Sequence, residues 1–169
     1  MKLKLSKIIA FTAVLMLLAA PAVNALDYKD WVPLVPEKIG GLDRQGEADG
    51  MNMEQSGQSW SAFEQNYSNG GENQVQLKIV SGSDAPGIRK FEALQKFNME
   101  TAEKKVKTLD VSGHKAVLEL NKKGGKSNLI VFAGEQTIVI FSTSSFDNEE
   151  DIISLADEVP LDKIADAAK

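Results

Sequence analysis

The segment Leu129–Phe141, with the sequence LIVFAGEQTIVIF, decides the fold that we predict for this chain. Two runs rich in β-branched and aromatic residues flank a short polar turn with a glycine, a pattern typical of an antiparallel hairpin. Ile130, Val131, Val139 and Ile140 lie in apolar runs without polar alternation. Strands of that kind pack on both faces, so we expect this hairpin at the centre of a sheet.

Two further strands precede the hairpin. The apolar-rich runs Val106–Val111 and Ala116–Leu120 are separated by the turn Ser112–Lys115, which contains Gly113, and Asn121–Lys126 with two glycines follows the second run. Short turns with glycine join neighbouring antiparallel strands, because glycine adopts positive φ without strain. Residues 104–141 are therefore predicted to form a meander of four antiparallel strands.

The N-terminal half adds an irregular strand at Leu42–Glu54 and a second hairpin. Ser59–Ser68 contains three aromatic residues, which favour a strand. After the break at Gly70-Gly71, apolar and polar residues alternate over Val75–Val80, as in a half-buried strand. These two runs are predicted to pair across the glycine turn.

Helices are predicted after each group of strands. The first starts at Ser83–Pro86, where a capping side chain precedes a proline in the first turn, and ends near Met99. The second covers Asp147–Asp157, whose acidic first turn has capping-box spacing and suits the positive end of the helix dipole. A short last helix is expected at Leu161–Ala168.

This order of elements predicts an α+β fold. We expect an antiparallel sheet of about six to seven strands flanked by helices, an α/β/α sandwich with the first helix on one face and the second on the other. The length of 169 residues fits one domain. We place that domain at residues 43–169, after an extended N-terminal arm at residues 26–42.

The arm holds the candidate residues for a partner surface. Pro33 and Pro36 bias the residues before them towards extended conformations, and together they match a PxxP ligand. Trp31 is a third candidate, because tryptophan is frequent at binding hot spots. The alternative is an apolar arm that packs on its own domain.

The first 25 residues have the pattern of a cleaved export signal. Three lysines precede the apolar run Ile8–Ala20, and small residues near its end predict signal-peptidase cleavage between Ala25 and Leu26. A membrane anchor is the competing interpretation, but 13 apolar residues span about 20 Å, less than the ~30 Å hydrocarbon core. We therefore expect a bacterial protein of the periplasm, or a secreted one, without a membrane anchor after cleavage.

Composition excludes several classes of function. The chain has no cysteine, which excludes disulfide scaffolds, thiolate metal sites and lipid attachment at the cleavage point. Loss of the leader removes three lysines and changes the formal net charge from −5 to −8. An acidic protein is a poor partner for nucleic acid or anionic membranes, so we expect another periplasmic or envelope protein as the partner.

The organisation resembles the PsbP-like α/β/α sandwich superfamily. The resemblance rests on Val35–Leu42 (VPEKIGGL), on Val111–Val117 (VSGHKAV) and on the closing helix. That superfamily includes accessory proteins of the photosystem, a Ran-binding nuclear import factor and exported bacterial proteins of unassigned function. The resemblance implies a binding or accessory role and supplies no site residues.

Met51 and Met53 are the candidate metal ligands. In an extended segment, residues i and i+2 face the same side, so both thioethers can face a soft ion such as Cu(I). His114, the only histidine, or Met99 would complete the site. The protein would then be a copper or small-ligand carrier. The alternative is that both methionines fill the core.

No residue pattern identifies a catalytic site. The segment Lys122–Ser127 lacks the first glycine and the strand–turn–helix context of a phosphate loop, and Asp147–Asp151 lacks the spacing of a calcium loop. The acidic residues of the N-terminal half are too scattered to identify a general acid–base pair: Asp43, Glu47, Asp49 and Glu54. The predicted function is a non-enzymatic accessory or binding protein without a cofactor. A hydrolase without a recognisable motif is the minor alternative.

Overall fold

The computed structural model describes residues 25–55, 57–82, 85 and 87–169. The predicted signal peptide lies outside the described residues except for Ala25, and the predicted helix start at 83–86 lies outside them except for Ala85. No helix in the described part is long and apolar enough to cross a membrane.

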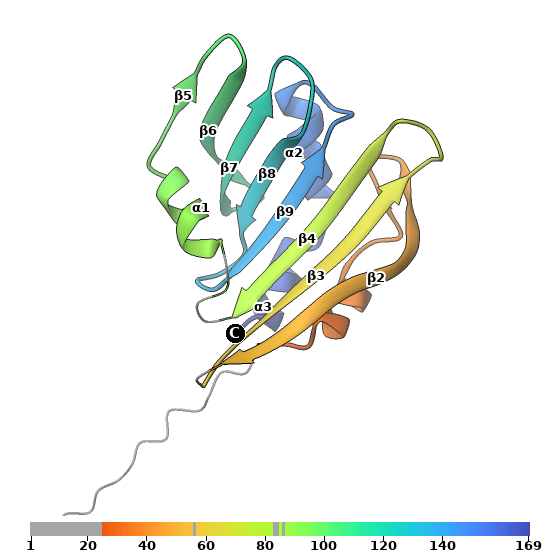
Figure 1. The fold of residues 1–169 in the computed structure, drawn as a ribbon, viewed down its shortest axis with the longest axis vertical. Coiled ribbons are helices and arrows are strands. Elements are labelled where there is room, and N and C mark those ends of the chain that lie inside the picture. Colours follow the sequence, from red (N-terminus) through yellow and green to blue (C-terminus); the bar gives the residue numbers. More distant parts are fainter. Residues whose placement is uncertain (1–24, 56, 83–84, 86) are drawn as a thin grey trace, which may run out of the picture.

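Nine strands and four short helices form the described part of the chain (Figure 1). The strands are β1 (Lys38–Ile39), β2 (Leu42–Gln55), β3 (Gln58–Ser68), β4 (Gln74–Gly82), β5 (Met99–Glu100), β6 (Lys104–Val111), β7 (His114–Asn121), β8 (Ser127–Phe132) and β9 (Thr137–Thr143). The helices are the 3₁₀ helix η1 (Tyr28–Leu34) and the α-helices α1 (Ile88–Leu94), α2 (Glu149–Asp157) and α3 (Leu161–Ala167).

The strands belong to one antiparallel sheet with the order β1-β2-β3-β4-β9-β8-β7-β6-β5. The meanders β1–β4 and β5–β9 each run from an edge of the sheet to its centre, where β4 pairs with β9. The predicted hairpin of β3 and β4 and the predicted meander β6–β9 are confirmed. Ile130, Val131 and Val139 are fully buried at the centre, as their apolar runs predict, whereas Ile140 is only partly buried on the open face.

The two faces of the sheet are covered to different extents. On one of them, the covered face, η1, α2 and α3 enclose the main core, which includes Leu77 of β4 and Ile152 of α2. On the other, the open face, Ile88 of α1 joins Ile130 and Ile138 in a smaller core. Figure 1 shows α2 and α3 behind the sheet and α1 in front of it.

The predicted α/β/α sandwich of six to seven strands is wrong. The structure is a β-rich fold, in which 48% of the described residues are strand and 21% are helix, built on a sheet of nine described strands. β1 and β5 are two residues long, too short to produce any periodicity in the sequence. α1 has only seven residues, so it does not form a second helical layer.

Two helix ends differ from the prediction. α1 ends at Leu94, because Asn98 Oδ1 accepts from the N–H of Thr108 at 2.8 Å and the chain turns into β5. α2 has Asn148 as its N-cap, since its Oδ1 accepts from Asp151 N at 2.9 Å. Acidic residues occupy the first turn of α2 as expected.

The N-terminal arm is docked on the covered face as η1 and is not extended. The Trp31 side chain is fully buried, and its Nε1 donates to Ser61 Oγ at 3.3 Å. The ring of Tyr28 lies so close to Gly50 that a Cβ at Gly50 would overlap it and would come within 2.5 Å of Ala62 O. The missing side chain at Gly50 therefore lets η1 lie against β2.

Candidate functional site

Met51 and Met53 lie on β2 with their side chains on the open face. The register pairs Met51 with Ala62 and Met53 with Trp60, and both of these neighbours pack against the small core of that face. Met51 is 52% exposed and Met53 is 43% exposed, so neither fills the core. Two flexible thioethers beside a half-buried tryptophan form an adaptable apolar surface.

Most of β2 forms an edge of the sheet (Figure 1). β1 pairs with β2 only at Leu42 and Asp43, whereas β3 pairs along the other side to the end of the strand. Within the described chain, no strand pairs with the outer side of residues 49–55. We call this stretch the β2 edge.

Every second residue of the β2 edge offers backbone groups to a partner. The pair that closes the turn into β3 is hydrogen-bonded in a two-residue hairpin, and such pairs alternate with non-hydrogen-bonded ones along the ladder. The N–H and C=O of Gly50, Asn52 and Glu54 therefore point away from β3. In agreement, the N–H of Gly50 donates to Oδ1 of Asp49 at 2.7 Å.

The side chains around the β2 edge are acidic. Glu47, Asp49 and Glu54 are exposed, and residues 45–55 contain no lysine or arginine. The preceding basic residue, Arg44, lies on the covered face. The two methionines therefore sit in a strip of negative charge.

His114 and Met99 do not join the two methionines. β7, which begins with His114, is five strand positions from β2, and β5, which begins with Met99, is seven positions away. At ~4.8 Å per strand these separations are about 24 Å and 34 Å, far beyond the reach of one metal ion. The described residues contain no group of three or more His, Asp or Glu side chains placed to hold a metal.

The region around His114 is not arranged as a hydrolase relay. His114 Nε2 lies 3.0 Å from Asp162 Oδ1 of α3, and the nearby Ser112 donates from Oγ to Asp157 Oδ1 at 3.0 Å. A triad requires the imidazole to lie between the hydroxyl and the carboxylate. Here each of the two side chains bonds a different carboxylate, so these contacts fasten the β6–β7 turn to α2 and α3.

The structure separates the three candidates of the arm. Trp31 lies in the main core, whereas Pro33 is exposed within η1. Pro36 is half-buried, and its carbonyl oxygen accepts from the hydroxyl of Tyr67 at 2.8 Å. The indole of Trp31 therefore holds the arm to the sheet and is not presented to a partner.

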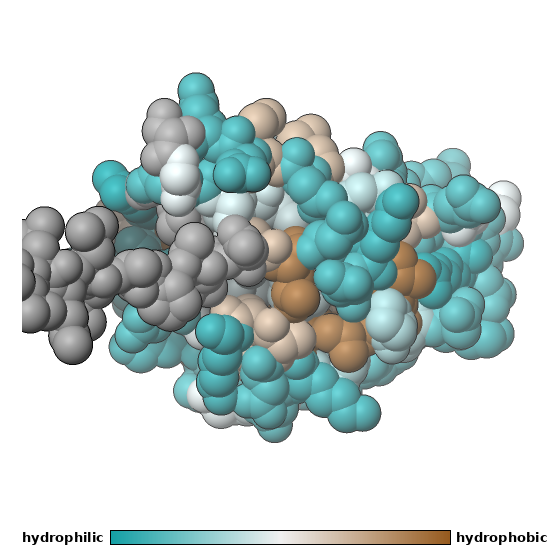
Figure 2. Space-filling view, turned by 90° about the horizontal axis from the view of Figure 1, so that it is seen from below, coloured by the Kyte–Doolittle hydropathy of each residue, from teal (hydrophilic) through white to brown (hydrophobic). Residues whose placement is uncertain are grey.

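The predicted cleavage bond lies at the end of the molecule where the end of β4, the β8–β9 turn and the C-terminus meet. Ala25 N donates to Ser59 Oγ at 2.8 Å, and Leu26 packs against the main core. Both residues line a hollow of 140 Å³ together with Ala168 and Lys169, next to a cavity of 440 Å³ at the β8–β9 turn. Hydrophobic side chains gather at the centre of this end, between hydrophilic ones (Figure 2). The first described residue and the C-terminus thus lie side by side.

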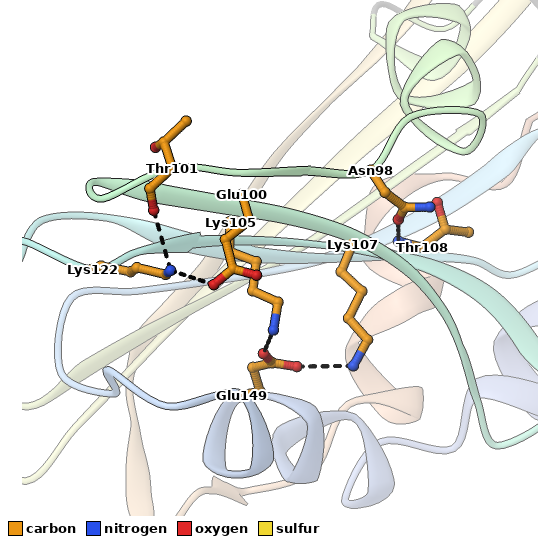
Figure 3. Close-up of polar contacts among 8 residues, drawn as sticks. All are labelled: Asn98, Glu100, Thr101, Lys105, Lys107, Thr108, Lys122 and Glu149. Atoms are coloured by element: carbon orange, nitrogen blue, oxygen red, sulfur yellow. Dashed lines mark hydrogen bonds and ion pairs between the residues drawn. The ribbon is translucent and has the colours of Figure 1, made fainter.

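A charged network joins β6 to α2 (Figure 3). Lys105 bonds Oε1 of Glu149, and Lys107 Nζ lies 3.0 Å from Oε2. The hydrogen bonds from Lys105 and Lys107 lower the pKa of Glu149, and Glu149 in turn raises the pKa of Lys105. Nearby, Lys122 Nζ donates to Glu100 Oε1 at 2.6 Å and so ties the turn after β7 to β5. These charges satisfy one another and hold the elements together.

Sequence reasoning found the methionines but missed the surface around them. Asp49 and Glu54 do not form a catalytic pair, and only the register shows that they lie on a free edge, with Glu47 in the irregular stretch just before it. The usable signal was the absence of lysine and arginine from residues 45–55 in a strand without a regular apolar face.

Comparisons of the chain with protein-family models, with curated proteins and with solved structures found no match.

Proposed function

We propose that the protein is a non-enzymatic binding protein that accepts an extended segment of another exported polypeptide against the β2 edge. The observation that carries this proposal is the unpaired outer side of residues 49–55 with Met51 and Met53 exposed beside it. An added strand would pair with the main chain of Gly50, Asn52 and Glu54, and the Gly50 N–H would exchange its bond to Asp49 for one to the partner. Such a role accords with the accessory function that the PsbP-like resemblance implies.

Charge selects the kind of partner. The exposed carboxylates of Glu47, Asp49 and Glu54 favour a segment that carries lysine or arginine. A second copy of this chain is disfavoured, because two antiparallel β2 edges would bring these carboxylates together. The alternate residues of the partner strand would contact the methionines, whose flexible thioethers fit varied apolar side chains.

A short peptide of alternating lysine and valine tests the proposal on the full-length chain. We expect saturable amide shifts and slower hydrogen exchange at Gly50, Asn52 and Glu54, and no effect from a peptide of alternating glutamate and valine. The matched variants are Glu54→Pro, which removes an outward N–H, and Glu54→Gln, which removes only the charge. Peptide binding should vanish in Glu54→Pro and weaken in Glu54→Gln. Undiminished binding to Glu54→Pro would refute strand addition.

A soft-metal carrier is the second candidate function, and the shared, exposed face of Met51 and Met53 favours it. The protein should then compete with a Cu(I) chelator, and Met51→Ala combined with Met53→Ala should abolish the competition. His114→Ala should have no effect, because His114 lies on the covered face five strands away. Unchanged competition in the double variant would end this candidate.

A further inference from the structure

A groove between η1 and β2 holds a charged side chain in a fixed orientation. Arg44 pairs in register with the buried Tyr67, so it lies on the covered face, and its side chain is only 15% exposed. Its Nε donates to Gln65 Oε1 at 3.0 Å. Gln65 is itself buried, and its Nε2 donates to the carbonyl oxygens of Gln45 at 2.8 Å and Asn66 at 3.2 Å. Gln65 is thus held by backbone carbonyls of the sheet, and it in turn orients the guanidinium of Arg44.

The outer side of the guanidinium is only lightly engaged. Arg44 has five N–H donors, and its bonds to Gln65 and Glu37 use two of them. The Glu37 carboxylate touches Nη1 at 3.2 Å through one oxygen, and its side chain is 82% exposed. A single contact to so exposed a carboxylate contributes little stability. Glu37 therefore accepts only one of the hydrogen bonds that the outer side of the guanidinium can donate.

The groove is large enough for a small molecule. Its volume is 530 Å³, within the usual range of about 300–1,000 Å³. Its lining combines apolar surface from Tyr28, Val32 and Ala48 with two cations, Arg44 and Lys29. It also includes the carboxylates of Glu37 and Glu47, so the formal charges of the lining cancel.

We propose that this groove binds a small monocarboxylate with an apolar body. The ligand carboxylate would displace Glu37 and form two parallel hydrogen bonds with Arg44, a geometry that is stronger than the single contact of Glu37. The apolar body would lie against Tyr28 and Val32. Highly charged anions such as phosphate are disfavoured, because Glu37 and Glu47 repel additional negative charge. This site differs from the β2 edge, because the ligand would lie on the covered face and would use no backbone group of residues 50–54, although Glu47 lies beside both.

Titration of the full-length chain with 3-phenylpropanoate, followed by NMR, tests this site. We expect saturable shifts of the Arg44 side chain and of the Ala48 amide. 3-Phenylpropan-1-ol, which has the same body without the carboxylate, and acetate, which lacks the body, should bind at least ~10-fold more weakly, a loss of about 1.4 kcal/mol. Inorganic phosphate should not compete.

Two variants move the affinity in opposite directions. Arg44→Lys keeps the charge but loses the two parallel N–H donors of the guanidinium, so binding of 3-phenylpropanoate should weaken about tenfold. Glu37→Gln removes the competing carboxylate, so binding should tighten several-fold. Glu92→Gln on α1 makes the same charge change far from the groove and should leave affinity unchanged. Glu37→Gln is a surface change that leaves the fold intact, so the proposal stays testable if Arg44→Lys does not fold. Absence of saturable binding, equal binding of the alcohol, tighter binding of phosphate or unchanged affinity in Glu37→Gln would each overturn the proposal.

Discussion

Replacement of Trp31 by alanine should destabilise the whole domain. The indole is fully buried, and a tryptophan buries at most ~250 Å², equivalent to about 6 kcal/mol of transfer free energy. Alanine retains part of that burial, and tryptophan-to-alanine changes in cores cost about 3–5 kcal/mol. Ser61, which is buried, also loses the indole N–H as a partner, at about 1 kcal/mol. We therefore expect Trp31→Ala to lower the free energy of unfolding by about 4–6 kcal/mol.

Urea denaturation followed by circular dichroism measures this loss. With an m-value of about 2 kcal/mol/M, the midpoint should fall by about 2–3 M. Asp30→Ala, an exposed change in the same helix, is the matched control and should cost less than ~1 kcal/mol. A loss below ~1 kcal/mol in Trp31→Ala would refute the docking of η1 and would make the arm available as a partner surface.

Three further changes test other parts of the structure. Gly50→Ala should lower the free energy of unfolding by about 1–3 kcal/mol in a urea experiment, because its Cβ would overlap the Tyr28 ring. Gly71→Ala, in an exposed turn, is the control and should be close to neutral. Equal stability of the two variants would contradict the contact between Gly50 and Tyr28. Burial raises the pKa of Tyr67 to about 12, so its contribution to stability is complete below pH 10 and is lost as the pH rises to 12, by roughly 3 kcal/mol. Tyr67→Phe should remove that part of the alkaline decline, and an identical decline in both proteins would show that Tyr67 does not cause it. The hydrogen bond from Lys105 is the largest cause of the lowered pKa of Glu149. The folded state therefore favours the ionised carboxylate, and the parent should be more stable than Glu149→Gln above about pH 4.5. This advantage should shrink as the pH falls below that value. Thermal unfolding across that range measures the advantage, and a constant difference would count against the ion pair.

The sheet could be predicted from the sequence where both faces of a strand are buried. The runs at β8 and β9 are apolar throughout, and hydrophobic burial alone dictates their central position. The glycine also predicted a turn between β6 and β7. The turn residues Ser112 and Gly113 both have positive φ, at 50° and 82°, as a two-residue hairpin turn requires.

The remaining features depend on contacts between distant residues. β5 exists because Met99 pairs with Val106, and two residues leave no periodic pattern. The docking of η1 depends on the bond from Trp31 to Ser61, thirty positions away. The β2 edge is visible only from the register, since the local sequence of a paired strand and of an edge strand can be the same.

The meeting of β4 with β9 has a consequence for the order in which the chain folds. Val75 lies opposite Thr143, so the middle of the sheet closes only when residues nearly seventy positions apart come together. Closure of such long loops is slow compared with local hairpin formation. A chain emerging from its N-terminus would complete β1–β4 early and would hold the inner side of β4 unpaired until β9 appeared. During that interval Leu77 and Ile79, which end in the main core, would be accessible to aggregation or to a chaperone.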